Sequence, residues 1–335
     1  MPRARRVYKN SAVYEVVSRA REGLPLPPTE TTNEILAGIY GRAQRDDRVL
    51  LCNFVEMNNH HHILAMPKTP ELFTHFYKEL KKGITESVKA LLGLSQLSLW
   101  ERRSTVAVVP TLEDVIERLV YIFCNPTKAG LVESIDEFPG LSSWHAFKTC
   151  EPSVEATVSV PVRCYHKAAI PRLPNDDTLT EEEDNRFVSY LQCSENVFEH
   201  ELVLKPLAWL EPFGVTDPKT IQAVRERVIK SVYEEEAKYR RNRTRPVMGV
   251  QHLRRQPYFK PHKPAKRERK IFVICSDTEL RQRIISFVRQ IAEKCRRCYE
   301  DLKQGLPVVW PDGVFIPWLP PRGFSSFSRE VLFRT

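Results

Sequence analysis

The sequence lacks three features that would place it in well-known structural classes. No apolar run approaches the length needed to cross a membrane, and the basic amino terminus, residues 1–6, lacks the apolar stretch of a secretory signal. No internal repeat is present. We therefore expect a cytoplasmic protein with no membrane partner, in which the eight cysteines are reduced thiols rather than a disulfide framework.

The cysteines give one metal-like pattern, which has two interpretations. Cys295 and Cys298 have the spacing of paired zinc ligands, and Cys164 with His166 could complete such a site. However, the pair lies inside a long helical pattern, where residues three apart simply share a face. We favour the structural interpretation.

Length and charge limit the remaining possibilities. A chain of 335 residues is too long for one small domain and suits two. Its formal net charge of +9 favours a polyanionic partner without specifying one. A membrane surface would satisfy the same charge, but with the motifs below nucleic acid is the better interpretation.

An apolar run at residues 49–55 leads into two asparagines and three consecutive histidines. Asparagine tolerates the left-handed backbone of tight hairpins, so we predict two strands that meet at a turn at residues 58–59. Because successive side chains on a strand point to opposite faces, His60 and His62 would project together and His61 would turn away. Two imidazoles on one rigid strand supply half of a metal site.

A second stretch, at residues 113–125, offers a nucleophile and a further metal ligand. Residues 113–125 have apolar side chains at helical spacing, and the following Pro126 disfavours further helix. On this helix Tyr121 and Asn125 are four residues apart and share a face. If that face docks on the histidine strand, two nitrogens, an amide oxygen and a tyrosine nucleophile surround one cation, which is the outline of a phosphoryl-transfer centre.

These two stretches carry a resemblance to a known family. From residue 57 the chain reads Met-Asn-Asn-His-His-His-Ile-Leu, and from residue 121 it reads Tyr-Ile-Phe-Cys-Asn-Pro-Thr-Lys-Ala-Gly-Leu-Val. Weaker similarities lie at residues 100–103 and 138–144. Over residues 7–147 the chain resembles the single-tyrosine HUH transposases, especially the REP-associated tyrosine transposases. The middle histidine, His61, replaces the bulky apolar residue usual in that family.

The order of predicted elements gives a fold class. A strand, a helix, a strand pair, a helix, a strand and a helix follow one another, which is the order of a ferredoxin-like α+β sandwich with an antiparallel sheet. The resemblance implies the same fold, an HUH nuclease domain. We divide the chain into a nuclease-like domain, a mixed α/β connecting region, a basic arm or linker and a mostly helical basic C-terminal region, at residues 1–150, 151–237, 238–270 and 271–335.

The resemblance implies a metal-dependent single-stranded DNA endonuclease and strand transferase that acts on hairpin DNA. Tyr121 would be the catalytic residue and would form a 5′-phosphotyrosine intermediate, and His60, His62 and Asn125 would hold the metal. Two histidines and an amide leave positions open for phosphate and fit Mg²⁺ or Mn²⁺. Monomers and homodimers both occur in the family, and a DNA substrate implies association with the nucleoid.

Basic residues are candidates for contacts with the DNA backbone, although ordinary solvated surface is the favoured explanation for the lysines of the helix at residues 70–92. Residues 238–270 are strongly basic and interleaved with aromatics, so they are either a tether that buries little or an arm that follows phosphates and stacks bases. The individual candidates are Arg102, Arg103, Lys81, Lys82, Lys128, Arg240, Arg241, Arg254 and Arg255.

Other functions remain open from the sequence. One is a domesticated DNA-binding protein that recognises a DNA structure without cleaving it. Another is a replication initiator or relaxase of the HUH superfamily, which usually keeps further domains or a second tyrosine. A metal-dependent hydrolase of another fold would need more acidic and histidine ligands than the first half offers. The intact metal-ligand candidates and Tyr121 favour the transposase-like enzyme.

Several local expectations can be compared directly with the structure. We expect Thr31 or Thr32 to cap a helix over residues 33–44, and Glu117 to be a surface carboxylate rather than a residue that orients Tyr121. Further strands are predicted at residues 13–17, 100–109, 154–162 and 271–275, and further helices at residues 70–92, 218–240 and 277–303.

Overall fold

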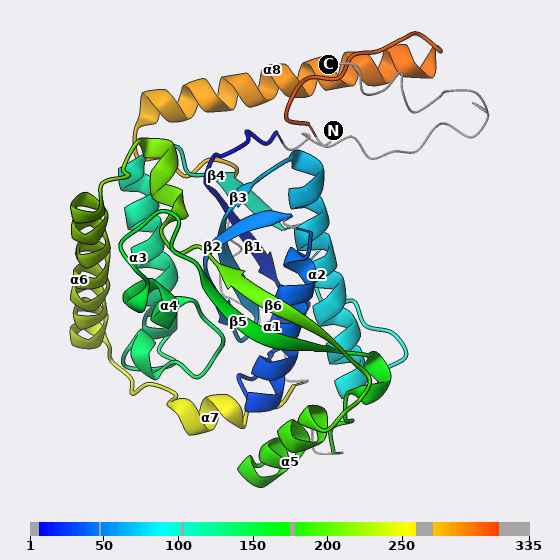
Figure 1. Cartoon of the computed structure of the whole chain (residues 1–335), viewed down its shortest axis with the longest axis vertical. Coiled ribbons are helices and arrows are strands. Elements are labelled where there is room, and N and C mark those ends of the chain that lie inside the picture. Colours follow the sequence, from blue (N-terminus) through cyan, green and yellow to red (C-terminus); the bar gives the residue numbers. More distant parts are fainter. Residues whose placement is uncertain (1–6, 47, 102–103, 175–177, 259–270, 315–335) are drawn as a thin grey trace.

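A four-stranded antiparallel sheet forms the centre of the computed structural model, which describes residues 7–46, 48–101, 104–174, 178–258 and 271–314. The strand order is β2-β3-β1-β4, and each neighbouring pair is antiparallel. Helices pack on this sheet, so the predicted α+β class is confirmed (Figure 1). The strands are β1 (Tyr14–Arg19), β2 (Val49–Met57), β3 (His60–Pro67) and β4 (Thr105–Val108).

The predicted hairpin forms as the sequence indicated. Strands β2 and β3 pair from Val49 opposite Pro67 to Met57 opposite His60, which leaves residues 58–59 as a two-residue turn. A bulge between Leu51 and Asn53 shifts the register within β2. Strand β1 lies on the other side of β3, so the histidine strand is central and its backbone is fixed from both edges.

Helices cover both faces of the sheet, as Figure 1 shows. Ile63 and Ala65 of β3 pack with α1 (Glu30–Gln44) and α2 (Pro70–Leu91) in one core. The alternate residues Leu64 and Met66 pack with α3 (Leu112–Lys128) and α4 (Trp144–Thr149) in a second core. Burial on both faces explains why residues 63–66 of β3 are all apolar instead of alternating with polar residues.

Two helix boundaries differ from the sequence-based prediction. Helix α1 begins at Glu30, because Thr29 rather than Thr31 or Thr32 caps it by accepting a hydrogen bond from the Thr32 amide at 3.0 Å. Helix α3 continues past Pro126 to Lys128. The proline is buried in the last turn, where the Ala129 amide still bonds the Asn125 carbonyl at 2.9 Å, so the missing N–H removes only one helical bond.

The connecting region packs directly on the first sheet. Strands β5 (Val158–Tyr165) and β6 (Val197–Leu204) form a two-stranded antiparallel sheet that lies across α1. Strand β5 therefore begins and ends later than residues 154–162. Helix α5 (Glu181–Gln192) lies between β5 and β6 in the chain, and its Asp184 carboxylate accepts the amides of Glu30 and Thr31 at the start of α1.

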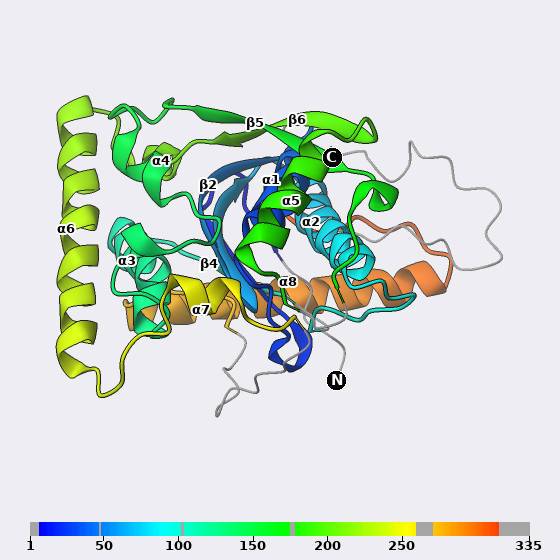
Figure 2. The ribbon, with the colours of Figure 1, turned by 90° about the horizontal axis from the view of Figure 1, so that it is seen from below.

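Helix α6 (Pro218–Asn242) runs along α3 (Figures 1 and 2) and is followed by the short α7 (Val250–Arg254). The described part of the predicted arm, up to residue 258, is mostly exposed or half-buried, but two of its residues are buried. Leu253 is fully buried, and the hydroxyl of the buried Tyr258 lies 2.8 Å from that of Thr32. The remainder, residues 259–270, lies outside the described residues.

Helix α8 (Thr278–Lys303) lies across one end of the molecule. The strand predicted at residues 271–275 is reduced to a single bridge between Val273 and Val108, and Ile271 and Phe272 are exposed. Strand β4 is also shorter than residues 100–109. Short 3₁₀ helices lie at Arg21–Gly23, Ile135–Glu137, Lys167–Ala169 and Ala208–Phe213.

Among the helices that the structure describes, none combines the length and the apolar character that a membrane span requires.

Candidate functional site

The histidines of β3 divide between the two faces of the sheet, as the strand period predicts. The rings of His60 and His62 lie together, with centroids 5.0 Å apart. His61 is on the opposite face, where its ring is 5.2 Å from that of Trp100 and its Nδ1 is 3.1 Å from a Glu56 carboxylate oxygen. His61 is therefore not available to the site formed by the other two histidines.

Helix α3 brings Tyr121 to the histidine pair. The Tyr121 and His62 ring centroids are 5.7 Å apart, and the two rings meet edge to face. Tyr121 is half-buried against the core between α3 and the sheet. Two cations lie against its ring: the guanidinium carbon of Arg118 is 3.9 Å and the Lys128 ammonium 4.6 Å from the ring centroid. The predicted meeting of the helix with the histidine strand is thus present within one chain.

Asn125 follows one helical turn after Tyr121. Its side chain is buried, and its amide nitrogen has no hydrogen-bond partner among the residues that the structure describes. A buried amide without a partner is costly, so such a group indicates that something else contacts it. Rotation of the amide by half a turn exchanges its nitrogen and oxygen and would offer the oxygen as a ligand.

A buried carboxylate that the sequence analysis did not identify completes the site. Glu15 of β1 is 2 % exposed, and His62 Nδ1 donates to it at 2.7 Å. Arg118 donates to both of its oxygens, at 2.7 and 2.8 Å. The sequence feature that could have identified Glu15 is its position as the one carboxylate in the apolar stretch at residues 12–17. Glu117, in contrast, is exposed, as predicted.

Burial and pairing together set the protonation states in the site. Burial alone would raise the pKa of the Glu15 carboxyl, but the hydrogen bonds and charges of His62 and Arg118 outweigh it and hold this pKa below its ordinary value. Burial lowers the pKa of His62 despite the nearby carboxylate. The pKa of His60 lies well below its ordinary value, through burial and then the neighbouring His62. A lowered pKa favours the neutral form of both imidazoles, which is the form that binds a metal.

These groups fit a divalent cation. A carboxylate can only accept, so the Glu15 contact places the proton of neutral His62 on Nδ1 and the lone pair on Nε2. That Nε2 atom is buried and has no hydrogen-bond partner in the described part of the chain. His60 Nδ1 lies 2.7 Å from the Asn59 side-chain oxygen, which by the same argument leaves its Nε2 as the electron-pair donor. The two imidazole nitrogens would be donors in a metal site, and the buried Asn125 amide without a described partner is the candidate for a third donor.

Other metal centres are not supported. Within residues 7–46, 48–101, 104–174, 178–258 and 271–314, no group of three or more histidine, cysteine, aspartate or glutamate side chains is placed to hold a metal ion. The zinc interpretation of Cys295 and Cys298 is therefore wrong. Cys295 is buried beside Ile291, and the Cys298 thiol lies 3.3 Å from the Val309 carbonyl oxygen. No disulfide bond joins any of the eight cysteines, all of which lie within the described residues.

The basic candidates of the first half differ in their surroundings. Lys81 contacts the hydroxyl of Ser104 at 3.4 Å, whereas Lys82 is exposed on α2. Lys128 is exposed at the end of α3 and is the candidate that lies against Tyr121. Two further candidates, Arg102 and Arg103, lie outside the described residues.

The basic candidates of the second half are divided between paired and exposed side chains. Arg240 donates to the Glu133 carbonyl at 2.8 Å, and Arg254 forms an ion pair with Glu30. These two side chains therefore join elements of the fold. The other two are exposed: Arg241 and Arg255.

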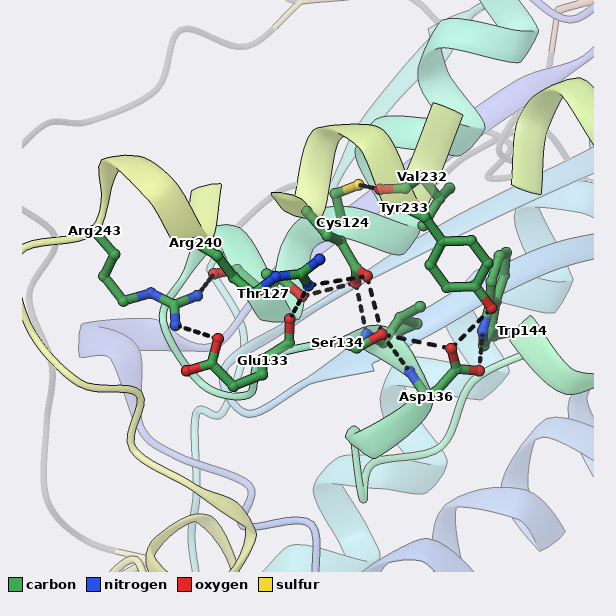
Figure 3. A network of polar contacts seen from close by, with 12 residues as sticks. Cys124, Thr127, Glu133, Ser134, Asp136, Trp144, Val232, Tyr233, Arg240 and Arg243 are labelled. Carbon is green, nitrogen blue, oxygen red and sulfur yellow. Dashed lines mark hydrogen bonds and ion pairs between the residues drawn. The ribbon is translucent and has the colours of Figure 1, made fainter. Parts of the chain in front are cut away.

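Helix α6 supports α3 on the side away from the sheet, and Figure 3 shows the contacts at its C-terminal half. The Cys124 thiol donates to the Val232 carbonyl at 3.5 Å. Arg243, just beyond α6, forms a 2.8 Å ion pair with Glu133. The turn that carries Asn125 is thus held by downstream residues as well as by the sheet.

No protein-family model and no curated protein matches this chain. A solved structure described as "Structure of the REP associates tyrosine transposase bound to a REP hairpin" is similar at 22% sequence identity, over 44% of this chain and 84% of that chain, with a TM-score of 0.38. A TM-score this low does not by itself establish a shared fold.

Proposed function

We propose that this chain is a metal-dependent endonuclease and strand transferase of single-stranded DNA, with Tyr121 as its nucleophile. The observation that carries the proposal is the contact between Tyr121 and His62, whose rings are 5.7 Å apart while the buried Nε2 of His62 has no partner among the described residues. A phenol can act as the nucleophile of a covalent phosphoryl transfer, and a pair of imidazoles beside it can hold the metal that assists the transfer.

The topology supports the proposed class. The strand order β2-β3-β1-β4, with α1 joining β1 to β2 and α2 joining β3 to β4, supports the ferredoxin-like sheet that we propose. We propose that residues 7–147 form an HUH nuclease domain on this sheet. The histidine pair lies on a central strand, where two neighbouring strands fix it, as a precise metal site needs.

In the proposed reaction the Tyr121 oxygen forms a bond to the phosphorus of a phosphodiester. The bond from phosphorus to the 3′ oxygen breaks, the phenol proton passes to solvent, and the departing 3′ oxygen takes up a proton. The 5′ phosphate is then held as a phosphotyrosine ester, which conserves the bond energy, so a 3′ hydroxyl can later reverse the step without a nucleotide cofactor. His60, His62 and Asn125 would hold Mg²⁺ or Mn²⁺, which supplies Lewis-acid stabilisation of the phosphate oxygens.

We propose hairpin DNA as the substrate. This part of the proposal depends on the family resemblance of residues 57–66 and 121–132, while the net charge of +9 supports a polyanion in general. Lys128 is exposed and lies against Tyr121, so we propose that it contacts the phosphate next to the cleaved bond. Because the histidines and Tyr121 come from one chain, a monomer would be sufficient for cleavage.

The test uses the full-length protein with end-labelled single-stranded hairpins and either Mg²⁺ or Mn²⁺. We expect an adduct that survives SDS, is lost on chelation and is lost in Tyr121→Phe. Tyr190→Phe is the matched control, because Tyr190 is an exposed tyrosine on α5, and it should keep the adduct. Binding without any adduct across a broad hairpin panel would instead establish a non-cleaving DNA-binding protein, and equal cleavage of unstructured strands would favour an initiator or relaxase.

A further inference from the structure

The buried carboxylate of Glu15 joins two parts of the site. It lies on the central β1, next to β3 in the sheet, and accepts one hydrogen bond from His62 and two from Arg118. An ionised carboxylate that is 2 % exposed is costly unless it is fully paired, and these three donors provide that pairing. Glu15 therefore fixes the ring of His62 and the guanidinium of Arg118 at the same time.

Arg118 in turn contacts the proposed nucleophile. It precedes Tyr121 by three residues on α3, so both side chains project from one face of the helix. The two parallel hydrogen bonds to Glu15 hold the guanidinium plane, and its central carbon is 3.9 Å from the Tyr121 ring centroid. A planar cation held in this way limits the orientations of the ring beside it.

We propose that Arg118 is a positioning residue, which holds the Tyr121 ring against the histidine pair and is itself held by Glu15. This inference rests on the proposed function for its catalytic consequence, but the orientation of the ring is a property of the protein alone. One carboxylate would then align the nucleophile and a metal ligand together. A lysine at position 118 keeps the charge but cannot form the two-pronged contact with Glu15.

The first measurement needs neither DNA nor metal. The full-length protein is labelled with 3-fluorotyrosine, and the ¹⁹F resonance of Tyr121 is identified by its loss in Tyr121→Phe. In Arg118→Gln this resonance should move toward the solvent-exposed position or broaden through exchange. Glu117→Gln, an exposed position on the same helix, should leave it unchanged. An unchanged resonance in Arg118→Gln would overturn the proposal whether or not the protein cleaves DNA.

The second measurement separates positioning from binding. Under single-turnover conditions we expect Arg118→Gln to slow adduct formation at saturating hairpin about 30-fold or more, since misplacing a reacting group by about an ångström costs about a hundredfold. The half-saturating hairpin concentration and the affinity for Mn²⁺ alone should change less than about threefold, since Arg118 is not a proposed ligand of either. Arg118→Lys should recover only part of the rate.

A guanidinium rescue distinguishes positioning from general structural damage. Millimolar methylguanidinium should restore part of the rate and the ¹⁹F position in Arg118→Ala, because it can occupy the space beside Glu15. Loss of rate without rescue, together with a lowered urea midpoint, would show a purely structural role and overturn the proposal. If the wild-type protein forms no adduct with any DNA, the proposed function fails, whereas the ¹⁹F results still decide the role of Arg118.

Discussion

The fully buried carboxylate of Glu236 accepts a hydrogen bond from the Thr127 hydroxyl at 2.8 Å, across the interface between α6 and α3. The same carboxylate accepts the Ser134 hydroxyl at 2.9 Å and the Ile135 amide at 2.6 Å. These contacts belong to the network in Figure 3. They connect the last turn of α3, just after Asn125, to α6. Thr127 and Glu236 are 109 residues apart in the sequence.

Glu236→Gln tests this connection. The amide of glutamine is uncharged and has one acceptor oxygen, so the Ser134 hydroxyl could no longer donate to the second position and the charge-assisted hydrogen bonds would be lost. We expect a loss of about 2–4 kcal/mol in the free energy of unfolding, the range for breaking a buried charged network. Urea unfolding followed by circular dichroism measures it.

The matched control is Glu234→Gln on the same helix. Glu234 is exposed, and within the described residues it forms a 3.8 Å surface ion pair with Lys230, so its substitution should cost less than about 0.5 kcal/mol. Equal effects of the two substitutions would contradict the role of Glu236 in holding α3.

Asp136 gives a prediction about pH. Burial alone would raise its pKa, but hydrogen bonds from Lys148, Trp144 and Tyr233 lower it below its ordinary value. A carboxyl with a lower pKa in the folded state contributes stability that is present above the unfolded pKa of about 4 and is lost as pH falls through the folded value. The difference in unfolding free energy between the wild type and Asp136→Asn should thus be largest near neutral pH and shrink below about pH 4.

Urea titrations at a series of pH values measure this difference. Glu137→Gln alters the exposed neighbouring residue and should show a smaller difference that does not follow the same profile. A gap between the wild type and Asp136→Asn that stays constant from pH 7 to pH 3 would show that the hydrogen bonds to Asp136 do not favour its charged form.

Gly38 sets how closely α1 approaches β5. A Cβ added at position 38 would lie 1.8 Å from the backbone oxygen of Arg163, far inside van der Waals contact. Gly38→Ala should therefore displace the β5–β6 pair and destabilise the fold by about 3 kcal/mol, near the upper end for overpacking. Thermal unfolding and amide exchange of residues 158–165 would detect the displacement.

Gly83→Ala is the control for helix propensity. There the nearest atom to an added Cβ is the Ile39 Cγ2 methyl, so the obstacle is a side chain rather than the backbone that blocks position 38. We expect this substitution to change stability by less than about 1 kcal/mol, because alanine also gains helix propensity over glycine. A Gly38→Ala variant as stable as Gly83→Ala would show that β5 can retreat from α1 without cost.

The sequence alone determined the features that depend on local periodicity and turn chemistry. The alternation of side chains along β3 placed His60 and His62 on one face and His61 on the other. The pair of asparagines at residues 58–59 predicted the tight turn. The spacing of four residues put Tyr121 and Asn125 on one face of α3. These features depend only on the repeat of a strand or a helix, which is set by residues close together in the sequence.

Only the tertiary structure decided which distant groups meet. No local pattern links Glu15 to His62 and Arg118, 47 and 103 residues away, because this pairing exists only once β1, β3 and α3 have packed together. For the same reason the sequence placed Tyr258 in an arm that buries little, whereas its hydroxyl lies beside that of Thr32, 226 residues earlier. A buried polar group needs a hydrogen-bond partner, and that partner can come from any part of the folded chain. The spacing of residues in the sequence therefore does not predict which residue it will be.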